Sequence, residues 1–396
     1  MRKAAGAAAL LAVGWALLWF AGEARRSHLA WSDFTVFLWK APSAARASGA
    51  ADAVPPRSGD PVQFVGLTQY LNNARAVVTH TIDDSTKYVP AAIETMDRYG
   101  IKATIFISTD RGPIEDLWPI LRRAVHNGHE IGSHSRTHPC LWPPSLRFCF
   151  FHYTDYEIAG SRDDILRNTD QPHVWSFAYP CGLCTKYDFV HRKLERAGYL
   201  VARNYPNEET GGHIVPDMQS YDPHTYNATY TQVVQKKGGI APTGRTDLAA
   251  INGKFDEVYG KGGIYNFMSH PQWLDYGPDK FYEQHLRYVS NRQDVWYVPM
   301  GPLYAYRRVV QHTQVRRLGP DRFAATCSLD PKVFPVSVTL EFRAPESWTP
   351  EADGRVLAER KAGLTDRWNE QYFRREGEKL YVTVRPSAVV VVGRPE

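Results

Sequence analysis

The chain has 396 residues, of which 43% are hydrophobic and 22% are charged, and its formal net charge at pH 7 is +5. This composition is ordinary for a folded protein and excludes an intrinsically disordered chain, and the length suggests two domains or one large domain with an appendage. No block of Lys and Arg is dense enough to predict nucleic-acid binding.

The N-terminus predicts attachment to a membrane. Arg2 and Lys3 precede an uncharged apolar run from Ala4 to Gly22. Cleaved signal peptides carry an apolar core of about 7–15 residues, whereas a spanning helix needs about 20, so the run favours an uncleaved signal anchor over residues 1–25. Cleavage at "AGEA" is the alternative. In either case we expect the body of the protein to lie outside the cytoplasm, in a periplasmic or extracellular location.

Residues 26–61 are expected to form a linker, because much of this stretch is small, polar and rich in Pro. Strand-like and helix-like stretches then alternate. The expected strands are 76–81, 101–108, 129–135 (passing into a loop), 174–180, 199–204, 262–270 and 294–299, and the expected helices are 88–99, 114–127, 155–168, 187–197, 248–259 and 280–290. Such alternation predicts parallel strands joined by crossover helices, in an α/β barrel or a layered sheet.

The pattern changes in the last part of the chain. The segments "FPVSVTLEF" and "KLYVTVRP" alternate apolar and polar residues, and "AVVVVG" is continuously apolar. This predicts a barrel-type domain over residues 62–311 and a small β-sandwich-like accessory domain over residues 312–396.

Polar residues follow three of the expected strands. Asp83 and Asp84 end the first, His134 and His138 follow the third, and His270 follows "NFMS". The C-terminal ends of barrel strands form the face on which active sites lie. One Asp and two His can hold a catalytic metal ion with open positions. The other Asp would then accept a proton from water, and the distant His would protonate the leaving group.

Two alternatives are open for these residues. The Asp83–Asp84 pair could simply cap the helix that begins near Pro90. An Asp with two His could also hold Fe(II), but such oxygenase sites lie in all-β folds, which the strand–helix alternation does not fit. His80, on the same strand as the Asp pair, is expected to be a hydrogen-bonded core residue and not a ligand.

Four short motifs in this order resemble the polysaccharide deacetylases with a NodB homology domain, carbohydrate esterase family four. They are "TIDDS" (81–85), "HSRTH" (134–138), "AYPCG" (178–182) and "MSH" (268–270). The resemblance covers residues 62–310 and implies a distorted (β/α) barrel. It also implies a metal-dependent deacetylase that hydrolyses N-acetyl groups of amino sugars in a cell-envelope or exported polysaccharide.

The resemblance implies a role for each matching residue. Asp83 would be the general base and His270 the general acid. A divalent metal ion, most often zinc, would be bound by Asp84, His134 and His138. The substrate and oxyanion site would be formed by Tyr179, by the backbone N–H of Cys181, and by Met268, which would line the acetyl-methyl pocket. Trp273, near the expected mouth, is either a sugar-stacking residue or a core residue.

Three departures from the family pattern affect these expectations. Ser85 replaces a Gly after the Asp pair, Cys181 replaces an aromatic residue, and Ala178 replaces the Arg that orients the base. We expect Arg203, at the end of the next strand, to supply the missing guanidinium and keep Asp83 ionised, because consecutive parallel strands are commonly neighbours. A surface Arg in a solvated loop is the alternative.

Five cysteines are compatible with an oxidising compartment. Cys140 and Cys149 are close enough in sequence to pair, as are Cys181 and Cys184, which leaves Cys327 alone. We expect a Cys181–Cys184 disulfide that stiffens the oxyanion loop, with two free thiols as the alternative.

A second class of function fits the same sequence. The protein could be a catalytically weak glycan-binding protein that keeps the barrel and holds polymer with its β domain. The intact set of Asp and His residues argues against this class, whereas Ala178 and Cys181 argue for it.

Overall fold

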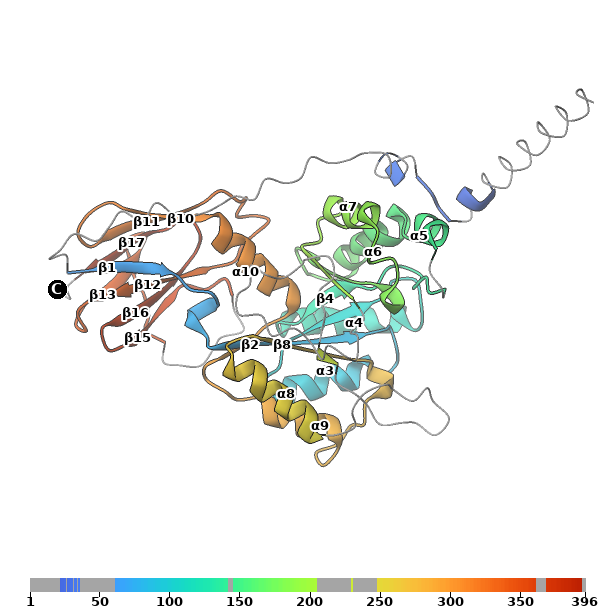
Figure 1. Cartoon of the computed structure of the whole chain (residues 1–396), viewed down its shortest axis with the longest axis horizontal. Helices are drawn as coiled ribbons and strands as arrows, with labels where there is room; N and C mark the ends of the chain where they lie inside the picture. Colours follow the sequence, from blue (N-terminus) through green and yellow to red (C-terminus); the bar gives the residue numbers. More distant parts are fainter. Residues whose placement is uncertain are drawn as a thin grey trace, which may run out of the picture.

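The computed structural model describes residues 22–25, 27–30, 32–33, 35, 61–141, 145–204, 229–230, 248–360 and 368–393. An α/β part and an antiparallel β part lie side by side and are joined by α10 (Met300–His312) (Figure 1). The predicted signal-anchor run, residues 4–22, lies outside the described residues except for Gly22. None of the helices within the described ranges is both long enough and apolar enough to cross a membrane.

The α/β part is built on one parallel sheet with the strand order β6-β5-β4-β3-β2-β8-β7, and β9 pairs with the start of β2. The strands are β2 (Ala76–Asp83), β3 (Ala103–Ile107), β4 (Glu130–Ser133), β5 (Ser176–Ala178), β6 (Val201–Arg203), β7 (Thr229–Tyr230), β8 (Ile264–Ser269) and β9 (Val295–Tyr297). All of these pairings are parallel, so the strands end on the same face. The sheet is a half-barrel, which confirms the predicted fold class.

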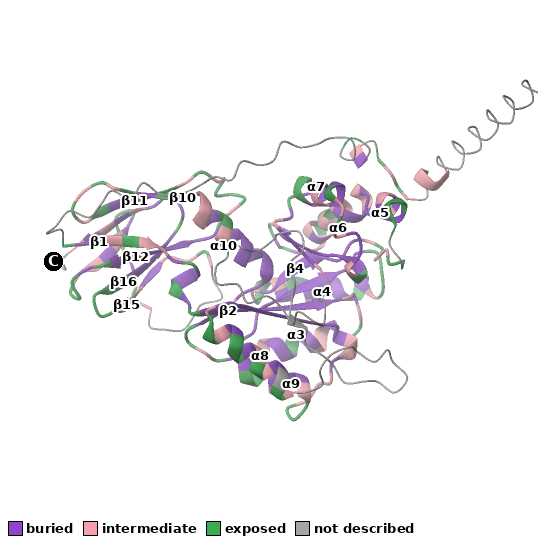
Figure 2. Ribbon diagram, viewed as in Figure 1, coloured by how far each residue is buried: buried purple, intermediate pink, exposed green. Residues whose placement is uncertain are grey.

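Helices cover the sheet where the sequence predicts them. They are α3 (Val89–Arg98), α4 (Ile114–His126), α6 (Asp155–Asn168), α7 (Asp188–Arg196), α8 (Leu248–Gly260) and α9 (Phe281–Val289). Each agrees with its predicted range to within one residue at either end. In α4, buried Ile114, Leu117, Trp118 and Leu121 recur at helical spacing and face the core. Figure 2 shows the central strands buried and the outer faces of α8 and α9 exposed.

Within residues 61–393, the described helices α5 (Leu146–His152) and α10 were not predicted from the sequence. Helix α5 is a short segment with Phe148, Cys149 and Phe151 buried. Helix α10 begins with Met-Gly-Pro, a poor pattern for helix prediction. Its Pro302 lies in the first turn, where the missing N–H costs no intrahelical hydrogen bond.

The antiparallel part consists of two sheets. One has the order β1 (Gln63–Leu67), β12 (Val338–Arg343), β16 (Lys379–Val384) and β15 (Tyr372–Glu376), and the other the order β10 (Thr313–Arg317), β11 (Arg322–Cys327), β17 (Val389–Gly393), β13 (Thr349–Ala352) and β14 (Arg355–Val356). Both sheets contribute to one hydrophobic core, with Phe323 of β11 packed on Phe342 of β12. The predicted β-sandwich-like domain is therefore present.

Strand β1 connects the two parts. It opens the predicted barrel range, yet it pairs antiparallel with β12 of the sandwich. The same hydrophobic core also contains Trp296 of β9 and Leu303 of α10. The two parts therefore share buried apolar surface, and the domain boundary between 311 and 312 stays a prediction.

Candidate active site

Polar side chains from four strands meet at the C-terminal face of the half-barrel. Asp83 is the last residue of β2, and Arg203 is the last residue of β6. His134 directly follows β4, and His270 directly follows β8. Because all four strands run in the same direction, their ends bring together side chains that are far apart in the sequence.

Asp84, His134 and His138 form a cluster in which one ligand atom from each residue lies within 4.8 Å of the others. Oδ1 of Asp84 is 3.9 Å from Nε2 of His134 and 3.6 Å from Nε2 of His138. These separations are too long for direct hydrogen bonds but match ligand atoms that surround one small cation. The donor set, one carboxylate and two imidazoles, therefore fits a divalent transition metal.

Neighbouring groups hold two of these ligands in position. Nδ1 of His134 is 2.8 Å from the carbonyl oxygen of Ala178, so this nitrogen donates and Nε2 is left to face the cluster. Oδ2 of Asp84 accepts a hydrogen bond of 2.8 Å from Nε2 of Gln272, which leaves Oδ1 toward the histidines. Gln272 lies just two residues after His270 and was not predicted from the sequence as a site residue.

The backbone at Asp84 explains the departure at position 85. Asp84 itself adopts a left-handed conformation, with φ of 78°, so the following residue needs no Gly. The Ser85 hydroxyl donates to the carbonyl oxygen of Ser108 and accepts from its N–H, both at 2.9 Å. Ser85 therefore fastens the turn after β2 to the end of β3.

Helix α6 fixes the loop that carries the two histidines. Glu157 accepts hydrogen bonds of 2.9 Å from the backbone N–H groups of Arg136 and Thr137. Asp164 forms a bidentate ion pair with Arg136, at 2.7 and 2.9 Å. The guanidinium crosses α6 at Gly160, where an added Cβ would lie only 2.7 Å from it. None of these supporting residues was predicted from the sequence.

Arg203 lies against Asp83, as the sequence analysis expected. Nη2 of Arg203 donates to both carboxylate oxygens of Asp83, and both residues are almost fully buried, at 1% and 3% exposure. Arg203 is also the register partner of Ala178 in the β5–β6 pair. The guanidinium that position 178 lacks is thus supplied from the same level of the next strand.

The pKa values of Asp83 and His270 reflect this arrangement. Burial raises the pKa of Asp83, but the neighbouring cationic groups, above all the guanidinium of Arg203, outweigh burial and hold the pKa below its usual value. Burial lowers the pKa of His270 by more than Asp83 and Asp84 raise it. Asp83 is therefore ionised and His270 largely neutral near pH 7.

The disulfides differ from the predicted pairing. Cys181 is bonded to Cys140, and Cys184 is bonded to Cys149, so the expected Cys181–Cys184 bridge was wrong. Both Cys181 and Cys184 have positive φ, so the turn directs the two side chains to separate partners on the preceding loop and on α5. Cys327 is the free cysteine within the described part of the chain, as expected.

The disulfides attach the segment after β5 to the segment that follows the histidine loop. Cys140 lies two residues after His138, so one bridge joins the metal-ligand loop to the Cys181 turn. Cys149 lies in α5, so the other bridge fastens the same turn to that helix. Two disulfides indicate a protein that folds in an oxidising compartment outside the cytoplasm.

The other predicted site residues differ in how far they are exposed to solvent. Tyr179 is 2% exposed and packs on the rings of Phe177 and Tyr153, so its side chain belongs to the core. Met268 is fully buried, with its sulfur 3.0 Å from Nη1 of Arg203. Cys181 is exposed at the turn.

Trp273 lies against the imidazole of His270. The two ring centroids are 3.9 Å apart, and Trp273 is partly buried at the end of the 3-10 turn Pro271–Trp273. His80 is a hydrogen-bonded core residue, as expected: its ring nitrogens contact the Phe267 carbonyl at 3.0 Å and the Tyr282 hydroxyl at 2.7 Å.

The chain is similar to known proteins in sequence and in structure. The sequence model of the family described as polysaccharide deacetylase matches residues 71–202. A candidate polysaccharide deacetylase from Mycobacterium smegmatis is 12% identical with a TM-score of 0.44, and the match covers 65% of this chain and 99% of that one. PdaA of Bacillus subtilis, a family 4 carbohydrate esterase, is 15% identical with a TM-score of 0.36, and the match covers 60% of this chain and 84% of that one. A family 4 carbohydrate esterase from Streptomyces lividans is 14% identical with a TM-score of 0.31, and the match covers 55% of this chain and 86% of that one.

Proposed function

We propose that this protein, whose residues 71–202 match the polysaccharide deacetylase family, is a metal-dependent enzyme that hydrolyses N-acetyl groups of amino sugars in a cell-envelope or exported polysaccharide. The observation that carries the proposal is the Asp84–His134–His138 cluster beside an ionised, Arg-clamped Asp83. A structural ion pair alone would not require three potential metal ligands next to it.

The proposed chemistry is hydrolysis of an amide. Asp84, His134 and His138 would hold a divalent metal ion such as Zn²⁺, which would supply Lewis acidity to polarise the acetyl carbonyl and lower the pKa of water. Asp83 accepts the proton of the attacking water, and Arg203 keeps this carboxylate charged and oriented. As the carbon–nitrogen bond breaks, His270 donates a proton to the departing amine, and the products are acetate and a free amino sugar.

The environment of His270 suits a general acid. Burial lowers the pKa of His270, so the protonated form that donates is the minor form near pH 7, but it is a stronger acid than an ordinary imidazolium. The ring of Trp273 lies against it at an interplanar angle of 33° and limits its rotation. The backbone of Cys181 is a candidate oxyanion donor, and its disulfide to Cys140 holds it in a fixed relation to the histidine loop.

The cellular setting of the proposal rests on the N-terminus and the disulfides. We propose that residues 1–25 anchor the chain in a membrane and that the enzyme acts on the outer side, where an exported polymer is accessible. The two disulfides support that side of the membrane.

The alternative, a catalytically weak glycan-binding protein, is weakened by one observation. It drew support from the absence of an Arg at position 178, and Arg203 supplies a buried guanidinium to the same carboxylate. What remains in favour of it is Cys181, where the family carries an aromatic residue.

The experiment that separates these functions is acetate release from a panel of N-acetylated and O-acetylated glycans, with and without a chelator. We expect metal-dependent release from acetylated glucosamine or galactosamine oligomers. Asp84→Ala should lose bound metal and activity together. Asp83→Asn should keep the metal yet lose about 10²–10⁴-fold in turnover, the usual size of general acid–base catalysis.

The control for these variants is Asp116→Asn, because Asp116 is an exposed carboxylate on α4. It should keep both metal and activity. Full activity in Asp83→Asn would reject the assignment of the base. No release from any glycan by the metal-loaded wild type would reject the deacetylase function itself.

A further inference from the structure

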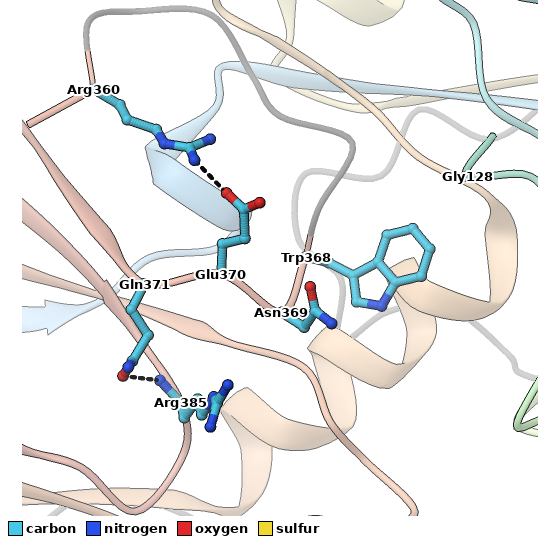
Figure 3. A pocket seen from close by; sticks show the side chains of 7 residues that line it. All are labelled: Gly128, Arg360, Trp368, Asn369, Glu370, Gln371 and Arg385. Atoms are coloured by element: carbon cyan, nitrogen blue, oxygen red, sulfur yellow. Dashed lines mark hydrogen bonds and ion pairs between the residues drawn. The ribbon is translucent and has the colours of Figure 1, made fainter. Parts of the chain in front are cut away.

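A cavity of about 660 Å³ lies where the β sandwich meets the α/β part, away from the strand ends that carry the metal cluster. It is lined by Gly128, Arg360, Trp368, Asn369, Glu370, Gln371 and Arg385 (Figure 3). Six of these residues come from the sandwich, and Gly128 comes from the turn between α4 and β4. The volume is in the range of small-molecule binding sites.

The cavity lies at the opposite end of β4 from the candidate active site. Gly128 precedes β4 by two residues, whereas His134 directly follows it. The four residues of β4 span about 13 Å at the usual strand rise. A small molecule in this cavity therefore does not reach the metal ligands, but an extended polymer is long enough to contact both places.

The side chains of the cavity have the chemistry that recognises a sugar ring. Trp368 is partly buried and supplies a flat apolar ring, which extends on the side of the cavity facing Gly128 (Figure 3). Beside it stand the amides of Asn369 and Gln371 and the carboxylate of Glu370. A pyranose ring has an apolar face of C–H groups and a rim of hydroxyls, so it can stack on the indole while its hydroxyls bond to planar polar groups.

Two contacts hold this arrangement before any ligand binds. Arg360 forms an ion pair with Glu370, and the Oε1 atom of Gln371 accepts a hydrogen bond of 3.2 Å from the backbone N–H of Arg385 (Figure 3). The carbonyls of Trp368 and Glu370 accept hydrogen bonds from Ser337, which anchors the segment to the sandwich. Such preorganisation lowers the entropy lost on binding.

We propose that this cavity is a second saccharide-binding site, which holds a sugar unit of the polymer at a distance from the metal cluster. The charges indicate which form of the polymer it prefers. Arg360 is paired with Glu370, and the exposed Arg385 adds a positive charge to the lining. An ammonium group would be repelled there, so the site favours the acetylated polymer over the deacetylated one. This preference rests on the proposed function, whereas saccharide binding itself does not.

The test measures binding of full-length protein to N-acetylated amino-sugar polymer and to its deacetylated counterpart of equal length, by co-sedimentation or calorimetry. Asp83→Asn serves as the background, because it is expected to bind metal without consuming the polymer. Trp368→Ala should weaken binding to the acetylated polymer about tenfold or more, the usual cost of losing a Trp anchor. Arg385→Ala should narrow the preference for the acetylated form.

Trp348→Ala is the matched control, since Trp348 is a partly buried Trp in the same sandwich that does not line the cavity. It should leave polymer binding unchanged. Asn369→Ala, at an exposed position, repeats the test in case Trp368→Ala fails to fold. Unchanged binding in both cavity variants, or an equal loss in Trp348→Ala, overturns the proposal.

Activity separates this proposal from the deacetylase function. In the otherwise wild-type chain, Trp368→Ala should leave kcat/KM unchanged on a short soluble acetylated oligomer and raise KM on the polymer. If Trp368→Ala weakens polymer binding but no acetate is released by the wild type, the saccharide site in the cavity is supported and the deacetylase function is rejected. If the protein releases acetate but Trp368→Ala does not weaken polymer binding, the deacetylase function is supported and the saccharide site in the cavity is rejected.

Discussion

The Nη2 atom of Arg203 donates to both carboxylate oxygens of Asp83, although the two residues lie 120 positions apart in the chain. The pair is buried, so the carboxylate would be costly to ionise without the guanidinium. Arg203 also contacts the sulfur of Met268 and packs over the ring of Phe106. It is therefore held from several sides, as a group that positions the proposed base would need to be.

Removing Arg203 should change the pH dependence of the reaction. Arg203 lowers the pKa of Asp83, so Arg203→Ala raises that pKa, and the base is ionised only at higher pH. The acidic limb of the pH–rate profile should then move to higher pH, because an opposite charge close to a carboxylate favours its ionised form. Turnover at neutral pH should fall.

Metal content and Arg203→Lys provide the controls for this prediction. Metal content should stay the same in Arg203→Ala, because Arg203 is not one of the three candidate ligands. Arg203→Lys keeps the positive charge but loses the planar guanidinium that donates to both carboxylate oxygens. Its acidic limb should therefore lie close to that of the wild type, whereas its turnover should stay below that of the wild type. An acidic limb that does not move in a folded Arg203→Ala protein would contradict the assigned role.

The two disulfides should contribute similarly to stability but differently to activity. They close loops of similar length, with sequence separations of 41 and 35 residues. In the chain-entropy account each stabilises the fold by about 4 kcal/mol. The Cys140→Ser/Cys181→Ser and Cys149→Ser/Cys184→Ser variants should therefore show comparable losses in the free energy of unfolding.

Activity should separate the two variants, because the Cys140–Cys181 bridge alone connects directly to the loop of His138. The Cys140→Ser/Cys181→Ser variant should lose more turnover than the other, when both are assayed well below their unfolding temperatures. Mass spectrometry after thiol blocking should recover the two cross-linked peptides with these partners. A Cys181–Cys184 peptide in the native protein would contradict the structure.

Most elements of the α/β part were predictable because their signals are local. Apolar residues at helical spacing, such as those of α4, determine both the helix and its buried face. Asp83, Asp84 and the two histidines were found because each follows a strand, and parallel strands end together. Arg203 was found by the same rule, from the position of β6 beside β5.

The features that could not be predicted from the sequence depend on contacts between distant segments. The pairing of Cys181 with Cys140 follows from a turn with positive φ at two cysteines, which spacing alone does not reveal. Gln272 acts on Asp84 across 188 positions, and a single Gln carries no sequence signal of that role. Strand β1 reads as the start of the α/β part but pairs with β12.

Gln272 should matter for metal binding. It donates to Oδ2 of Asp84 and so turns Oδ1 toward the histidines. Gln272→Ala should weaken metal affinity about 10–100-fold, the usual effect of losing a partner of a ligand. Gln272→Glu should be at least as harmful, because it places a second carboxylate against Asp84.

Metal affinity, measured by competition with a chromophoric chelator, checks this prediction without relying on turnover. Gln284→Ala is the matched control, since Gln284 also donates through its amide but to the Asp279 carbonyl. It should bind metal as the wild type does. Equal metal affinity in Gln272→Ala and the wild type would show that Asp84 is positioned without this contact.

The stability of the fold should fall as the pH falls below neutrality. Burial lowers the pKa of His80 and of His285 to about 3, so both are neutral in the folded chain. In the unfolded chain they titrate near 6.5. Between these values the unfolded state binds more protons, so each residue should lower the free energy of unfolding by about 1.4 kcal/mol per pH unit as the pH decreases.

Denaturant unfolding from pH 7.5 to pH 5 measures this slope. In His285→Gln one of the two buried imidazoles is gone, so the decrease below pH 6.5 should be shallower by about 1.4 kcal/mol per pH unit, whatever the variant costs in absolute stability. His126→Gln is the control, because the His126 side chain is 64% exposed, although it pairs with Asp170. Below pH 6.5, the free energy of unfolding of His126→Gln should fall with pH as steeply as that of the wild type. The same slope in His285→Gln and the wild type would mean that His285 is not held neutral by burial.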